Sequence, residues 1–127
     1  MITLATLPHA TAQQVFDQVS SHLLAQGKRS ADESKYQPLV NGQADACMYR
    51  GPQGLKCAAG CLIGEGEYNY NMECRGWDTL VRHGVVPPAH QELIVQLQSI
   101  HDSCRPSKWS EALDRLATRM GLKFTAP

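Results

Sequence analysis

Apolar side chains recur at helical spacing near the start of the chain, over 11–26. Their stripe consists of Val15, Phe16, Val19, Leu23 and Leu24. Residues three and four positions apart lie on one face of a helix, so this pattern predicts an amphipathic helix with one buried face. Thr11 and Gln14 have the form of an N-terminal capping box, and Gly27 is placed to end the helix.

Two further helical patterns fill the last third of the chain, over 88–103 and 108–120. Their apolar faces are Leu93, Ile94, Leu97, Ile100 and Cys104 in the first, and Trp109, Ala112, Leu113, Leu116, Ala117 and Met120 in the second. Pro88 suits a first helical position, Ser107 is a candidate N-cap, and Gly121 with Leu122 predicts a Schellman ending. Since Pro106 separates the two patterns, we expect an antiparallel pair of helices.

The middle of the chain has weaker periodicity. A short helix is expected over 77–83, ending at Gly84. Two compact apolar segments, 47–50 and 55–57, flank turn-forming residues and predict a β-hairpin. The apolar run 58–63 fits either a buried strand or a helical turn entering the core. The polar segments 30–46 and 64–71 are expected to be loops, and the pattern leaves open whether 30–46 is ordered.

Together these elements predict a mainly α (α+β) fold: a small helical domain of about four helices with one short β-hairpin. The chain has 127 residues. That length fits a single domain over 1–127, and a domain of this size can bury a core without disulfides or a metal.

Charge and hydropathy narrow the function classes. Twelve Lys and Arg balance twelve Asp and Glu. Nucleic-acid binding and attachment to an anionic membrane both depend on an excess of basic residues, so we expect neither partner. No apolar run approaches the roughly 20 residues that span a bilayer, and the first residues have no signal-peptide pattern. We therefore expect a cytoplasmic protein.

The five cysteines raise two chemical hypotheses. Cys47, Cys57 and Cys61 could bind zinc with a fourth ligand from His101, Cys74 or His83. Their spacing is irregular, so we expect buried free thiols and no cofactor, with zinc as the alternative. Alternatively, Cys61 could be a nucleophile at a helix N-terminus with His101 as its base and Asp102 as the orienting carboxylate. Adjacent residues on a helix diverge by about 100°, so we expect the His101 and Asp102 side chains not to face each other.

The loop that follows the cysteine segment is acidic and aromatic. Its candidate contact residues are Glu65, Glu67, Tyr68 and Tyr70. Exposed tyrosines anchor many protein interfaces because they bury a large area at low entropic cost, whereas a merely solvated loop explains the composition equally well. From Glu65 to Asp78 there are four acids and one base, and from Arg105 to Lys123 five bases and two acids. Such modest opposite surfaces suit a protein partner better than DNA.

A wider pattern of residues extends over 47–117. The pattern is Cys47-x-Tyr49-Arg50, then Gly54-x-Lys56-Cys57-Ala58-x-Gly60-Cys61-Leu62-Ile63, then Tyr68, Met72 and Glu73, then Leu93, Leu97, Gln98, Ile100, His101 and Asp102, and finally Pro106, Trp109, Leu113 and Ala117. The chain thereby resembles a group of small uncharacterised proteins of phages, prophages and bacterial genomes. The resemblance implies a phage or mobile-element setting in a bacterial host cytosol. With it, we expect a protein that binds and modulates a host protein, such as an inhibitor of a bacterial defence system, rather than an enzyme; a Cys/His metal site or thiol enzyme is the alternative.

Overall fold

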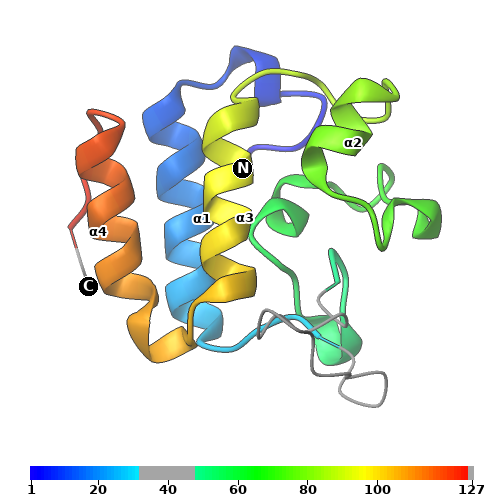
Figure 1. Cartoon of the computed structure of the whole chain (residues 1–127). Helices are drawn as coiled ribbons and strands as arrows, with labels where there is room; N and C mark the ends of the chain where they lie inside the picture. Colours follow the sequence, from blue (N-terminus) through cyan, green and yellow to red (C-terminus); the bar gives the residue numbers. More distant parts are fainter. Residues whose placement is uncertain (32–47, 126–127) are drawn as a thin grey trace.

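The computed structural model describes residues 1–31 and 48–125, and these residues are mainly helical (Figure 1). Their α-helices are α1 (Ala12–Gln26), α2 (Trp77–Arg82), α3 (Gln91–Ser103) and α4 (Trp109–Arg119). Short 3-10 turns connect them: η1 (Leu7–His9), η3 (Pro52–Gly54), η4 (Ala59–Leu62), η5 (Tyr70–Met72) and η6 (Pro106–Lys108). The helices of this part of the chain include none that is long and apolar enough to cross a bilayer.

Helices α1, α3 and α4 each pack against the other two, and α2 packs on α3, on its other side from α4 (Figure 1). Turn η4 packs against both α1 and α3. The buried side chains form one cluster that includes residues of the N-terminal segment, of η4 and of each α-helix. Its largest fully buried members are Trp77, Trp109, Phe16, Leu7, Leu23, Leu62, Ile63, Leu80, Leu93, Ile94, Leu97 and Leu113. The core therefore joins the α-helices to the segments of the chain that have little regular secondary structure.

The N-terminal helix follows its sequence pattern closely. The Gln14 N–H donates to Thr11 Oγ1 at 3.1 Å, and the Thr11 N–H donates to Gln14 Oε1 at 2.8 Å. Gly27 ends the helix with a φ of 69°, a left-handed conformation that glycine adopts without steric cost. The predicted capping box and the predicted end of this helix are both confirmed.

Helix α3 starts three residues later than the sequence predicts. Pro88 lies in a turn, and the Gln91 N–H donates to the Pro88 carbonyl at 3.2 Å. His90 has a φ of 58°, which interrupts helical geometry directly before the helix begins. The His90 ring lies 2.7 Å from the carbonyl of Ala10, an atom of the N-terminal segment. This long-range contact holds the turn and explains why Pro88 is not the first helical residue.

Helices α3 and α4 form the expected antiparallel pair (Figure 1). The sequence places Ser107 at the N-cap of α4, but this residue lies within η6 and the cap position is Lys108. At the other end the Leu122 N–H donates to the Ala117 carbonyl at 2.8 Å, and Gly121 has a φ of 69°. The predicted Schellman ending is therefore confirmed, whereas the predicted start is one residue early.

The segment before α2 is less regular than predicted. Residues 58–63 contain a 3-10 turn, so of the two structures left open the helical turn is correct. Around the turn at 51–54 the described residues show one isolated antiparallel bridge, between Arg50 and Lys56, and no longer strand pairing. The β-hairpin stays a prediction, because part of its first arm lies outside the described residues. The expected loop over 30–46 also lies outside them from residue 32 onward.

Gly60 offers a direct test of how η4 packs. A Cβ at this position would overlap the carbonyl oxygen of Tyr49 and lie 3.0 Å from its carbonyl carbon. Backbone atoms cannot rotate away as a flexible side chain can, so Gly60→Ala should lower the free energy of unfolding by at least about 2 kcal/mol. Gly66→Ala is the matched control, because its Cβ would have no atom within 4 Å. Urea unfolding curves of the two variants measure the difference, and equal midpoints would contradict this packing.

Candidate functional site

The 64–75 loop, which contains the candidate contact residues, is attached to the N-terminal segment by Glu67. The Glu67 carboxylate accepts three backbone N–H groups: Gly64 at 2.7 Å, Leu4 at 2.9 Å and Ala5 at 2.9 Å. Burial alone would raise the pKa of this carboxyl, but these hydrogen bonds favour the ionised form more strongly and lower the pKa. Glu67 therefore fixes the start of the loop, and its charge is engaged within the chain.

Glu73 fixes the other end of the same loop. Its side chain is only 8% exposed. It accepts the N–H groups of Tyr49 at 2.9 Å and Arg50 at 3.1 Å, and the hydroxyl of Tyr68 at 2.7 Å. These are charge-assisted bonds, which are shorter and stronger than neutral ones. Glu73 thus holds the 48–50 segment against the loop.

Tyr68 belongs to this internal network. The Arg50 guanidinium lies over its ring, with Cζ 4.8 Å from the ring centre. Burial, followed by the hydrogen bond to Glu73, raises the pKa of the Tyr68 hydroxyl to about 12, so it remains a proton donor at neutral pH. Arg50 itself donates to the carbonyls of Ile63 at 3.1 Å and Gly64 at 3.0 Å. Tyr68 therefore supports the loop from within.

Tyr70 and Glu65 are the candidate contact residues that face solvent. Tyr70 is 66% exposed and Glu65 is also exposed. Tyr70 begins η5, whose N-cap Asn69 accepts the Asn71 N–H at 2.8 Å. The last residue of that turn, Met72, is buried in the core. The structure thus divides the four candidates into two that build the loop and two that the loop presents.

The two cysteines of η4 and its preceding turn are in environments that disfavour thiolate. Burial raises the pKa of Cys57 well above its ordinary value and that of Cys61 to about 12. The Cys61 thiol donates to the Ala58 carbonyl at 3.2 Å, and Cys57 Sγ accepts the Gly60 N–H at 3.3 Å. The nucleophile hypothesis required a lowered pKa at a helix N-terminus, and Cys61 instead lies inside a short 3-10 turn.

His101 is fully buried and uses both ring nitrogens within the chain. Nε2 accepts the Ser30 N–H at 3.0 Å, so the ring proton lies on Nδ1 and is donated to Asp102 Oδ1 at 2.7 Å. The ring also stacks on Trp109, with centroids 5.6 Å apart. Neither nitrogen is left to act as a base for Cys61 or to bind a metal. The sequence-based expectation that His101 and Asp102 do not face each other is wrong, because side-chain rotation closes the angle between neighbouring Cβ directions.

The His101–Asp102 pair is part of a longer network at the end of α3. Gln98 donates to Asp102 Oδ1 at 2.8 Å and accepts the Ala59 N–H at 2.9 Å. Arg29 donates to the carbonyls of His101 at 3.1 Å and Cys104 at 2.8 Å. The i,i+4 spacing of Gln98 and Asp102 is a visible signal in the sequence, whereas the contacts with Ala59 and Arg29 come from distant segments and have no such signal.

The proposed zinc ligands that the structure describes are not gathered into one cluster. Among the described residues no three His, Cys, Asp or Glu side chains are close enough together to hold a metal ion. Cys47 lies outside those residues, Cys57 and Cys61 are in the turn around η4, and Cys74 is exposed. The alternative ligand set of Cys47, Cys57, Cys61 and His101 therefore gains no support from the described geometry.

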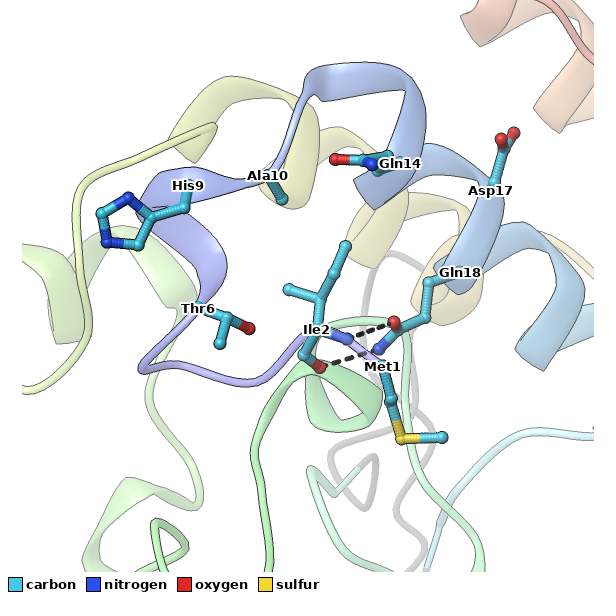
Figure 2. A pocket seen from close by; sticks show the side chains of 8 residues that line it. All are labelled: Met1, Ile2, Thr6, His9, Ala10, Gln14, Asp17 and Gln18. Carbon is cyan, nitrogen blue, oxygen red and sulfur yellow. Dashed lines mark hydrogen bonds between the residues drawn. The ribbon is translucent and has the colours of Figure 1, made fainter.

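A hollow of about 440 Å³ lies beside the N-terminus of α1 (Figure 2). Gln18 lines it and is bonded to the main chain of Ile2, accepting its N–H at 2.7 Å and donating to its carbonyl at 2.9 Å. Gln14 is engaged in the capping box. Figure 2 shows Ile2 between His9 and Asp17, the two titratable side chains among the residues that line the hollow. This hollow therefore does not bring an acid and a base together.

Comparison of the chain with protein-family models, with curated proteins and with solved structures finds no match in any of the three.

Cysteine reactivity tests the environment of η4. With a pKa of about 12, Cys61 should be alkylated by iodoacetamide slowly at pH 7.5 and much faster once the protein is unfolded in urea. Exposed Cys74 is the internal control and should react first in the folded protein. Mass spectrometry of peptides after timed labelling gives both rates. Faster labelling of Cys61 than of Cys74 in the native state would restore the thiol-enzyme hypothesis.

The clamp formed by Glu67 predicts a pH-dependent contribution to stability. Its folded pKa is lowered from an ordinary value of 4.5, so the contribution is complete at neutral pH and is lost as the pH falls through 4.5 toward the lower folded value. Glu67→Gln should cost about 1 kcal/mol at pH 7, a modest figure because the carboxylate is partly solvated. Its deficit against wild type should shrink on acidification to pH 3. Exposed Glu65→Gln is the control, and urea unfolding at each pH is the measurement; a constant deficit would contradict the assignment.

Proposed function

We propose that this protein is a small binding protein that acts by contacting another protein through the surface formed by Glu65 and Tyr70. One observation carries the proposal: Tyr70 is 66% exposed on a loop whose two ends are fixed by Glu67 and Glu73. Large exposed aromatic side chains on soluble domains are candidates for contact with a partner, particularly where the backbone below them is held in place.

Fixation of the loop favours binding because less conformational freedom is lost when the partner arrives. Each flexible group that becomes immobilised at an interface costs about 0.5–1.5 kcal/mol of binding free energy. Here the carboxylates of Glu67 and Glu73 order the backbone before any partner is present. Tyrosine adds a rigid ring with a polar end, a combination that interfaces use as an energetic centre.

Charge and setting define the partner class. Two of the loop's acids are engaged internally, while Glu65 remains exposed and Asp78 is exposed at the start of α2. A face with one large aromatic ring and a modest negative charge suits a protein rather than a nucleic acid, and the balanced composition agrees. The resemblance to phage and prophage proteins makes a bacterial host protein the partner that we propose, with modulation of that protein, for example inhibition of a defence system, as the consequence.

Affinity capture from a bacterial host lysate tests this proposal. The wild-type chain should retain one protein in stoichiometric amount, and Tyr70→Ala should lower the affinity for that purified protein by at least tenfold, since an interfacial tyrosine of this kind contributes 2 kcal/mol or more, roughly 30-fold. Glu65→Lys should also weaken binding. Glu111→Lys is the matched charge reversal at an exposed position of α4, and this variant should bind as wild type does.

Isothermal titration with the captured protein gives each affinity, and thermal unfolding shows that each variant is folded. If Tyr70→Ala and Glu65→Lys bind as tightly as Glu111→Lys, this surface is not the contact surface and the proposal fails.

A further inference from the structure

A small pocket lies between the start of α2 and the neighbouring face of α3. Its volume is about 210 Å³, which suits one side chain rather than a cofactor. Among the residues that line it are Trp77 and Asp78 from α2 and Gln98, Ser99 and Asp102 from α3. The two helices lie beside each other in Figure 1, and Gly76, also at the pocket, follows directly on the 64–75 loop.

Asp102 is held in a fixed position in this pocket. Its Oδ1 accepts two hydrogen bonds, one from His101 Nδ1 at 2.7 Å and one from Gln98 Nε2 at 2.8 Å. Both donors are themselves fixed, because His101 Nε2 accepts the Ser30 N–H and Gln98 Oε1 accepts the Ala59 N–H. The side chain of Asp102 is nevertheless 33% exposed. A carboxylate that neighbouring side chains hold in place, and that is partly exposed to solvent, is arranged to accept a hydrogen bond from a ligand.

The charge of the pocket is not balanced by the described chain. Asp78 supplies a second carboxylate, and no Lys or Arg is among the described residues that line the pocket. The ion pairs of the described residues join neither Asp78 nor Asp102 to a Lys or Arg. The indole of Trp77 is 1% exposed, and its N–H has no acceptor within the described structure. The described lining of the pocket thus combines two carboxylates with an aromatic residue and includes no basic side chain.

We propose that this pocket binds an arginine side chain of the protein partner, an inference that rests on the proposed binding function. A guanidinium matches two carboxylates because its five N–H donors have a fixed planar arrangement. Gly76, at the pocket, follows directly on the 64–75 loop, and the same partner is proposed to contact both Tyr70 and the arginine site.

Titration of the full chain with N-acetyl-arginine amide, followed by ¹H–¹⁵N NMR, tests the ligand class. The indole signal of Trp77 and the amide signals of Ser99 and Asp102 should shift. The amide signals of exposed residues on α4, such as Glu111, should not. N-acetyl-citrulline amide has nearly the same shape without the charge, so its affinity should be at least tenfold weaker. Equal shifts with the citrulline compound, or shifts confined to other parts of the chain, would overturn the proposal.

Two variants test the residues. Asp102→Asn and Asp78→Asn should each weaken binding of N-acetyl-arginine amide at least tenfold, and Asp114→Asn on exposed α4 should leave it unchanged. Asp78 makes no hydrogen bond to the His101 network, so its variant keeps the test valid if Asp102→Asn impairs folding. Retained affinity in Asp78→Asn and Asp102→Asn overturns the assignment.

The same variants measured against the captured partner separate this inference from the proposed function. If Tyr70→Ala abolishes partner binding while both aspartate variants bind normally, the arginine site fails and the binding surface stands. If all of these variants bind the partner as wild type does, the proposed surface and the arginine site both fail. Loss of partner binding in the aspartate variants and in Tyr70→Ala supports both.

Discussion

The structure depends on one constraint: the backbone N–H groups of its irregular half need acceptors, and among the described residues no sheet supplies them. Side chains from distant segments provide them. From the 64–75 loop, Glu67 accepts the N–H of Leu4 and Glu73 accepts that of Tyr49. From α3, Gln98 accepts the N–H of Ala59 and His101 accepts that of Ser30. Since an unpaired buried N–H costs about 1–3 kcal/mol, these contacts determine where the non-helical segments can lie on the helices.

The same constraint changes how the acidic loop is understood. In the sequence, the loop has the composition of an acidic surface. In the structure, the carboxylates of Glu67 and Glu73 accept backbone N–H groups, and only the other acidic side chain of the loop faces outward. The carboxylates of Glu67 and Glu73 are bonded within the chain and are less exposed than that of Glu65, so a partner reaches them less easily. Exposed Tyr70 therefore carries more of the argument for binding than the number of acids does.

Local signals predicted the helices well and the connections poorly. The end of α1 at Gly27 and the end of α4 before Gly121 follow from cap chemistry, which involves only neighbouring residues. The start of α3 depends on a contact between His90 and Ala10, eighty residues apart, which no local pattern encodes. The candidate site divides in the same way: exposed Tyr70 could be recognised from its loop, whereas the internal role of Tyr68 depends on where Glu73 lies.

His101 shows how a residue can resemble a catalytic group and have another role. Its pairing with Asp102 has the distances of a base and its orienting carboxylate, but Nε2, the atom that would accept a substrate proton, is occupied by the Ser30 N–H. The pair therefore acts in the opposite sense: the imidazole orients the carboxylate, and the carboxylate is the group that reaches a pocket. A carboxylate held in this way has little reorganisation left to undergo when a cation arrives. Such a carboxylate is suited to bind a cation, which is the role that we propose for it.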